Sequence, residues 1–236
     1  MRLNFSAPTV HAGAGILGLL LLAFASPVLA QDSVWTWSGQ ITAVSDYRDR
    51  GYTLSDQGPA LQGELTVAHV SGFYGGVWAS TIDDYGLGPD GDGARVEVTL
   101  YAGWYGSVSG WDVDVGVWDN RYPDGTDVDY VEFPVRIGRS IGDAAWTLGV
   151  IYAPSQTGLG DADNTYLWTR IDYAPTGWPV SISATVGHED GGFAPDGKVD
   201  WTLAAERSIG PATLGVAWVD SDTEDHALVL SVGVGF

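Results

Sequence analysis

The last ten residues of the chain indicate its fold class, and they read Ala227-Leu228-Val229-Leu230-Ser231-Val232-Gly233-Val234-Gly235-Phe236. One face of this segment would carry the side chains of Leu228, Leu230, Val232, Val234 and Phe236. A period of two residues places these side chains on one face of a β-strand, whereas a helix would distribute them around its axis. The segment is therefore predicted to be a strand with one strongly apolar face.

The same period recurs in segments of about ten residues that end at Gly, Pro, Asp or Asn. These segments are 35–46, 59–69, 73–83, 94–105, 110–119, 128–139, 144–153, 164–174, 179–188, 198–208, 211–219 and 226–236. Short turns alternate with longer acidic loops, and the loops are 47–58, 84–93, 120–127, 154–163, 189–197 and 220–225. This alternation is typical of a transmembrane up-and-down barrel, and aromatic residues near both ends of the segments fit its two interfaces. We therefore predict an all-β, antiparallel barrel of about 12 strands over residues 31–236.

Composition excludes several function classes. The chain has 236 residues, with 30 acids against 10 bases and a formal net charge of −20, so nucleic acid is a poor partner. It has no Cys, which excludes disulfides, thiolate chemistry and metal sites ligated by Cys. A soluble secreted barrel or sandwich remains an alternative, but it would have to bury the apolar strand faces in a shared core.

Residues 1–30 resemble an export signal that is removed in the mature protein. Arg2 supplies the positive start, residues 13–25 form a short apolar run, and Val28-Leu29-Ala30 has the small residues of a cleavage site. A membrane anchor is the alternative, but the run is too short to span a bilayer comfortably and Pro27 follows it.

The terminal aromatic residue of the last segment resembles the C-terminal signature of bacterial outer-membrane proteins. Their assembly machinery reads this signature. The resemblance implies that Phe236 is an assembly signal and that the barrel assembly machinery and outer-membrane lipids are partners. It also implies that the protein lies in the outer membrane of a Gram-negative bacterium.

A second resemblance lies in the block over residues 38–82. Its motif residues are Ser45, Asp46, Tyr47, Arg48, Arg50 and Gly51, followed by Gly72, Phe73, Tyr74, Trp78 and Ser80. The block resembles the TorF family of porins, also known as Gcw_chp proteins. Members of this family usually place a hydrophobic or aromatic residue between the two arginines, where this chain has Asp49. The resemblance implies an outer-membrane location and a porin role, and it supplies no catalytic residues.

Charged side chains on the polar strand faces are the candidate pore lining. The acids are Asp46, Glu64, Glu97, Asp112, Asp114, Glu132, Asp172, Asp200 and Glu206, and the bases are Arg95, Arg136 and Arg170. A barrel of about 12 strands encloses more space than side chains simply fill, so an aqueous path for small solutes is expected. The excess of acids favours cations. The alternative is that these charges pair across the lumen and plug it, which would leave a structural or surface-interaction barrel.

Two further patterns suggest other chemistry. Acidic stretches at 90–93, 161–164 and 220–225 offer oxygen ligands that could hold divalent cations, but none completes a twelve-residue calcium loop. His69-Val70-Ser71 resembles the His-x-Ser pair of lipid A deacylase barrels, but it falls beside a short turn, away from the outer leaflet. An outer-leaflet lipid enzyme is thus the third alternative. We expect no enzyme activity, no metal centre and no cofactor.

Overall fold

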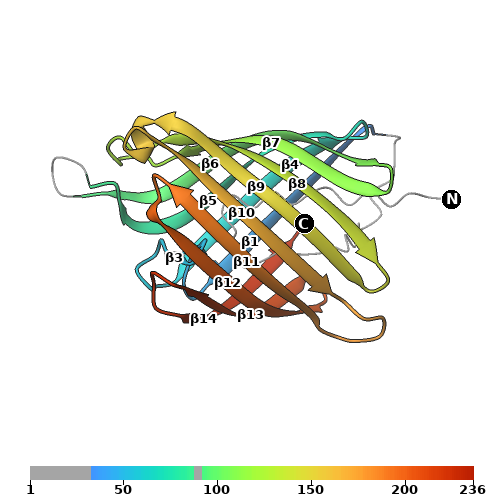
Figure 1. Cartoon of the computed structure of the whole chain (residues 1–236). Helices are drawn as coiled ribbons and strands as arrows, with labels where there is room; N and C mark the ends of the chain where they lie inside the picture. Colours follow the sequence, from blue (N-terminus) through green and yellow to red (C-terminus); the bar gives the residue numbers. More distant parts are fainter. Residues whose placement is uncertain (1–32, 88–91) are drawn as a thin grey trace.

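The computed structural model describes residues 33–87 and 92–236, and in this part of the chain twelve antiparallel strands close into a barrel (Figure 1). The barrel strands are β1 (Trp35–Val44), β4 (Ala60–His69), β5 (Phe73–Tyr85), β6 (Ala94–Val108), β7 (Trp111–Arg121), β8 (Tyr130–Ile141), β9 (Ala144–Gln156), β10 (Ala162–Tyr173), β11 (Ser181–Gly191), β12 (Ala194–Ile209), β13 (Ala212–Ser221) and β14 (Ala227–Gly235). This confirms the predicted fold class. The expected export signal at 1–30 and the acidic residues 90–91 lie outside the described residues.

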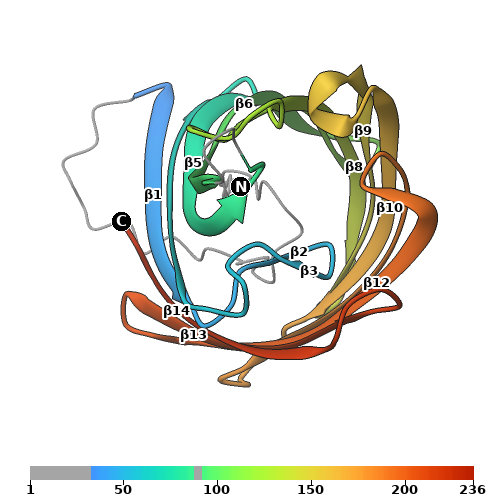
Figure 2. The ribbon, with the colours of Figure 1, turned by 90° about the vertical axis from the view of Figure 1, so that its left-hand side faces the viewer.

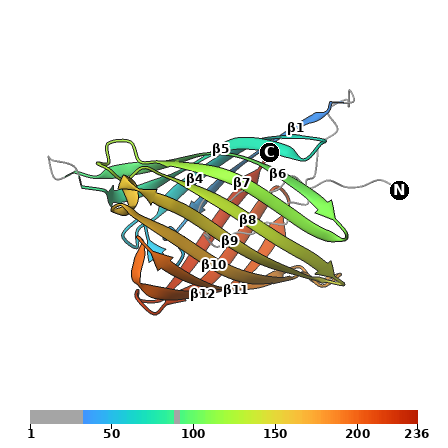
Figure 3. The same cartoon turned by 45° about the horizontal axis from the view of Figure 1, so that its top comes forward.

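Each barrel strand pairs with the next one along the chain, and β1 closes the ring by pairing with both β4 and β14. The ladder between β1 and β4 joins ten residue pairs, whereas the ladder between β1 and β14 joins five, from Gln40–Gly235 to Val44–Ser231. The first residues of β1 therefore extend past the end of β14, and Figure 3 shows this end of β1 projecting from the barrel.

The strands differ from the prediction mainly at one end of the barrel, which we call the long-loop end. The opposite end, with the tight turns and the C-terminus, is the short-turn end (Figure 1). Residues 189–197 were predicted to be a long loop, but β11 continues to Gly191 and β12 begins at Ala194. The acidic residues that suggested a loop belong to the strands, because Glu189 pairs with Lys198 across the ladder.

The outer and inner faces of the barrel have opposite character. On β6 the outward Leu100 is 52% exposed, while the neighbouring Thr99 and Tyr101 are buried inside. On β14 the outward side chains from Leu228 to Phe236 are exposed, while Val229 and Ser231 are buried. A surface of this kind is suited to lipid. Among the described residues, no helix is long and apolar enough to cross a membrane.

Two aromatic rings lie over glycines on the inner face of β5 and β6. Gly76 pairs with Tyr101 and Gly103 pairs with Tyr74, and in both pairs a Cβ on the glycine would collide with the tyrosine ring. Rings that cover glycines in this way fix the register of neighbouring strands. The phenol groups of Tyr74 and Tyr101 are thereby directed into the lumen.

We predict that Leu100→Arg weakens folding in lipid, because it places a charge on the outer face near the middle of β6. An Arg facing lipid near the bilayer midplane costs about 2–4 kcal/mol. Urea unfolding in liposomes measures the loss, and Leu100→Val is the matched control that keeps the face apolar. Equal stability of the Arg and Val variants would contradict the assignment of the outer face.

We also predict that Phe236 is needed to close the barrel. Its backbone exchanges hydrogen bonds of 2.8 and 2.9 Å with Gly39 of β1, and its ring covers the same glycine. Deletion of Phe236 should therefore lower the folded fraction, measured by heat-modifiable gel migration, more than Phe236→Ala, which keeps the backbone pair. Phe236→Tyr is the control that should fold normally. A deletion variant that folds as well as the native chain would refute the role of this residue at the seam.

Candidate functional site: a hairpin folded into the barrel

The segment between β1 and β4 folds into the lumen. It contains β2 (Arg48–Asp49) and β3 (Tyr52–Thr53), which pair with each other and not with the barrel wall. Figure 2, a view toward the long-loop end, shows this β2–β3 hairpin inside the ring of strands. Residues 47–58 thus form a long connection between two barrel strands, as predicted, but this connection lies inside the barrel.

The tip of the hairpin is a two-residue turn formed by Arg50 and Gly51. Their φ angles are 47° and 90°, the positive values that a type I′ turn requires at both positions. Gly51 also lies against the barrel wall, where a Cβ would come within 2.9 Å of Ser221 Cβ and 3.2 Å of Asp200 Cβ. The Arg-Gly pair of the motif is thus explained by turn geometry and close packing.

The hairpin has its own polar support at its base. The carboxylate of Asp46 accepts hydrogen bonds from Arg48 Nε at 2.6 Å, Thr53 Oγ1 at 2.7 Å and Ser55 Oγ at 3.3 Å. The hydroxyl of Ser55 also accepts from the backbone N–H of Tyr47 at 2.8 Å. These bonds lie within the segment itself, so the hairpin is stabilised as one unit.

The side chain of Arg50 at the tip joins two carboxylates of the barrel wall. Its Nη2 donates to Glu132 Oε1 of β8 at 2.7 Å, and its Nη1 donates to Glu189 Oε1 of β11 at 2.8 Å. The side chains of Arg50, Glu132 and Glu189 are at most 3% exposed. Charged hydrogen bonds in such a dry environment are strong, and breaking one side leaves an uncompensated buried charge.

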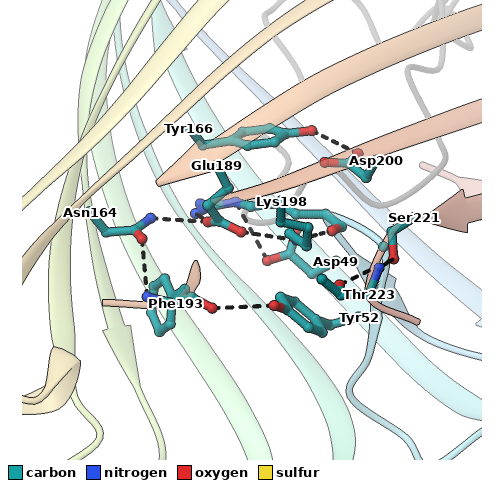
Figure 4. Close-up of polar contacts among 12 residues, drawn as sticks. Asp49, Tyr52, Asn164, Tyr166, Glu189, Phe193, Lys198, Asp200, Ser221 and Thr223 are labelled. Atoms are coloured by element: carbon teal, nitrogen blue, oxygen red, sulfur yellow. Dashed lines mark hydrogen bonds and ion pairs between the residues drawn. The ribbon is translucent and has the colours of Figure 1, made fainter. Parts of the chain in front are cut away.

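Neighbouring strands surround this ion pair with further polar groups. Lys198 of β12 donates from Nζ to Glu189 Oε2 at 2.9 Å and to the carbonyl oxygen of Arg50. Asn164 donates to Glu189 Oε1 at 3.0 Å, and the Tyr166 ring lies 5.0 Å from Arg50 Cζ. Figure 4 shows Glu189 and Lys198 together with Asn164 and Tyr166, with Asp200 beyond the tyrosine hydroxyl.

The charge of Arg50 is secured by its surroundings. Burial by itself lowers the pKa of the guanidinium, but Glu132 and Glu189 outweigh this and raise its pKa well above the ordinary value. The tip of the hairpin therefore remains cationic at any physiological pH.

A second buried group ties the base of the hairpin to the wall through Glu97. Its carboxylate accepts from the Tyr47 hydroxyl and the Tyr122 hydroxyl, each at 3.0 Å. Burial and the nearby Glu97 raise the pKa of both Tyr47 and Tyr122 well above the ordinary value, so both hydroxyls stay neutral donors. The ring of Tyr47 also packs at 5.6 Å from that of Trp78.

Toward the short-turn end, the polar side chains of the lumen are more exposed to solvent. Arg136 donates to Asp114 at 2.6 Å, and Arg170 pairs with Asp172 at 2.7 Å, with side chains that remain 8–23% exposed. Glu64 accepts from the Tyr101 hydroxyl at 2.8 Å. This half of the interior is therefore better hydrated than the half around Arg50.

The other predicted lining residues are placed as follows. Arg95 lies at the long-loop rim, 65% exposed, and pairs with Asp83 and Asp84 at 3.2 and 2.9 Å, apart from the interior groups. Asp112 interacts with Tyr105, and Glu206 interacts with Arg170. Asp200 accepts from the Tyr166 hydroxyl at 3.0 Å.

The remaining motif residues have structural positions. Ser45 exchanges hydrogen bonds of 2.9 Å with Leu230 of β14, Tyr74 donates to Asp114 at 2.7 Å, and Ser80 is buried. Gly72, with φ of 95°, and Phe73 form the turn into β5. The motif thus combines hairpin residues with residues of the wall that receives the hairpin.

Four residues around Arg50 were not predicted as site residues, and they are Glu189, Lys198, Tyr166 and Asn164. Alternation along β11 does place Glu189 on the same face as Ser183 and Thr185, so it could have been found by extending the strand. No comparable signal connects Arg50 to the wall, because that contact spans 139 residues to Glu189 and depends on the inward fold.

The His69–Ser71 pair, which suggested a lipid enzyme, lies in an exposed turn at the short-turn end. His69 Nδ1 lies 2.7 Å from Ser71 Oγ, but the pair is exposed in the tight turn between β4 and β5, where Gly72 N also donates to the His69 carbonyl. Within 33–87 and 92–236, no group of three or more His, Asp or Glu side chains is arranged to hold a metal ion.

These features define a class of protein: a closed antiparallel barrel with an apolar exterior and an interior of charged groups. The chain belongs to the family described as bacterial protein of unknown function (Gcw_chp), whose model matches residues 29–234. No curated protein matches this sequence.

Solved structures with a similar fold include porins and other membrane proteins. A NanC porin is 9% identical, with a TM-score of 0.52 over 85% of this chain and 98% of that one. A structure from a study of in-meso crystallisation of membrane proteins is 12% identical, with a TM-score of 0.56 over 85% of this chain and 83% of that one. A porin refined at 1.8 Å is 12% identical, with a TM-score of 0.43 over 86% of this chain and all of that one. At such low identities, the two structures with TM-scores above 0.5 show a similar fold alone.

We predict that Glu189→Gln destabilises the barrel strongly, because Lys198 would lose its carboxylate partner and Arg50 would lose one of its two. Breaking a buried ion pair from one side typically costs about 3–5 kcal/mol. Urea unfolding measures the loss, and Asp83→Asn, which removes an exposed partner of Arg95, should cost no more than about 1 kcal/mol. Similar losses in the two variants would show that the Arg50 contacts contribute no more than a surface pair.

Proposed function

We propose that this protein is an outer-membrane channel for small solutes and that the β2–β3 hairpin forms its constriction. The observation that carries the proposal is the inward hairpin within a polar lumen. A barrel of this size encloses more space than wall side chains fill, and here a segment of the same chain occupies the long-loop half while the other half stays partly hydrated. The fold shared with porins supports the same function.

The sidedness follows from the lengths of the connections. Barrels of the outer membrane have short periplasmic turns and longer external loops. The hairpin would therefore lie near the external mouth, and the hydrated half would open toward the periplasm. A location in the outer membrane requires export, for which residues 1–30 are the proposed signal. We also propose that the barrel assembly machinery inserts the chain.

The lumen charges favour cations. Interior acids outnumber interior bases, and the acids include Asp112, Asp172 and Asp200 in addition to the paired carboxylates around Arg50 and Arg136. Because a narrow pore is comparable in size to a Debye length of about 8 Å, such an excess concentrates cations in it. Small cations are thus the proposed solutes.

Single-channel recording in planar bilayers tests the function, and reversal potentials across a salt gradient test the selectivity. We predict a cation-selective current, and a weaker preference in Glu64→Gln combined with Asp172→Asn, since both residues lie in the hydrated half. Thr176→Ala, at the periplasmic turn, is the control that should keep the native selectivity. An anion-selective native current would contradict the charge argument.

A closed structural barrel is the second candidate function. It is favoured by the dryness of the Arg50 ion pair, whose carboxylate partners leave little room for water at the long-loop end. Purified, folded protein that inserts into bilayers without any current would support this candidate over the channel.

A further inference from the structure

The guanidinium of Arg50 occupies a pocket that belongs to other parts of the barrel. The carboxylates of Glu132 on β8 and Glu189 on β11 accept hydrogen bonds from its two terminal nitrogens, and the Tyr166 ring of β10 lies beside it. Paired carboxylates and an aromatic face are the groups that recognise a guanidinium. We propose that this pocket binds the guanidinium group of a solute. In the closed barrel, the side chain of Arg50 occupies the pocket instead.

The pocket is preformed, because the barrel wall positions its carboxylates independently of the hairpin. Asn164 of β10 and Lys198 of β12 donate to Glu189 at 3.0 and 2.9 Å. Asn120 of β7 donates to Glu132 at 3.4 Å. All of these groups are on barrel strands, so the two carboxylates stay in place when Arg50 withdraws.

The pocket has a net negative charge when the Arg50 side chain leaves it, and this charge favours binding of a cation. Glu132, Glu189 and Asp200 would then face the ammonium of Lys198, an excess of negative charge in a buried site. Within the described residues, Oδ2 of the buried Asp200 has no hydrogen-bond partner, although its other oxygen accepts from Tyr166. Buried carboxylates require a partner, so a cationic solute is preferred over an anionic or neutral one.

The hairpin can release the pocket at its tip. The tip is joined to the wall by the Arg50 side chain, by Lys198 at the Arg50 carbonyl and over the Tyr52 ring at 3.9 Å, and by the Tyr52 hydroxyl, which donates to the Phe193 carbonyl at 3.2 Å. Arg48 also donates to the Asp225 carbonyl at 3.1 Å, and Gly51 packs against Ser221. The base is held separately by Tyr47 at Glu97 and by Asp83 N, which donates to the Leu54 carbonyl at 2.8 Å. A solute that competes with Arg50 would therefore free the tip and leave the base attached. This inference rests on the proposed channel function and names its solute class as small guanidinium compounds.

Calorimetric titration of the folded barrel in detergent tests the pocket directly. Methylguanidinium is the probe, and methylurea, which has a similar shape and no charge, is the matched control. We expect methylguanidinium to bind Arg50→Ala, and to bind at least about tenfold more weakly when Glu132→Gln and Glu189→Gln are added, since each carboxylate supplies a charged hydrogen bond. Absence of binding to folded Arg50→Ala, or equal binding of methylurea, would overturn the proposal.

Folding of each variant is checked by heat-modifiable gel migration. If Arg50→Ala does not fold, Arg50→Lys serves instead, because an ammonium keeps the charge but loses the two-pronged contact. We then expect the same loss of methylguanidinium affinity when Glu132→Gln and Glu189→Gln are added to Arg50→Lys. Equal affinity of the two variants would again overturn the proposed pocket.

Planar bilayers separate the pocket from the channel function. Methylguanidinium should raise the open fraction of the native barrel, and methylurea should not. Binding in detergent without current under any condition overturns the channel function and leaves the pocket. A native current that methylguanidinium does not change, together with no binding to Arg50→Ala, overturns the pocket and leaves the channel.

Discussion

The contact of Arg50 with Glu132 and Glu189 determines the interior of this barrel. A guanidinium that is withdrawn from water must be paired, and both carboxylates pair with it here, so this contact fixes the position of the hairpin tip against the wall while the pairs are intact. The positive φ of Arg50, the close approach of Gly51 and the buried Lys198 all follow from this position. The Asp46 network then supports the rest of the segment. This one buried interaction thus holds the segment between β1 and β4 inside the barrel.

The barrel wall meets a different constraint, which is that backbone groups facing lipid must be paired. Closure of the sheet satisfies this requirement for every strand, and the apolar side chains can then face outward. The interior carries the polar groups, and their hydration differs along the axis. Near the long-loop end, ion pairs are dry, whereas around Arg136 and Arg170 the side chains retain solvent contact. In the proposed channel, resistance to passage would therefore be concentrated at the level of Arg50.

Sequence reasoning predicted the wall well because strand periodicity is local. Alternation along β14 or β6 follows directly from the side chains, and each predicted segment corresponds to one barrel strand. The hairpin could not be predicted in the same way. The segment has the polar and turn residues of a loop, and contacts with residues 50 to 177 positions away bring it inside, among them Glu97, Glu132 and Asp225. Glu189 was missed for a related reason, since residues 189–197 were interpreted as a loop, whereas Lys198 began the predicted strand 198–208 and its partner was not recognised.

The uneven ladders of β1 have a consequence for the dynamics of the barrel. With five residue pairs to β14 against ten to β4, the seam is held by about half as much backbone pairing as its neighbour. Regions with fewer hydrogen bonds open at lower free energy than the protein as a whole. Amide hydrogens of β1 and β14 near the seam should accordingly exchange with solvent deuterium before those of β9 and β10, whose ladder is continuous over most of its length. The barrel would thus fluctuate as a sheet that parts along one line, with the Phe236 backbone as the last pair at its edge.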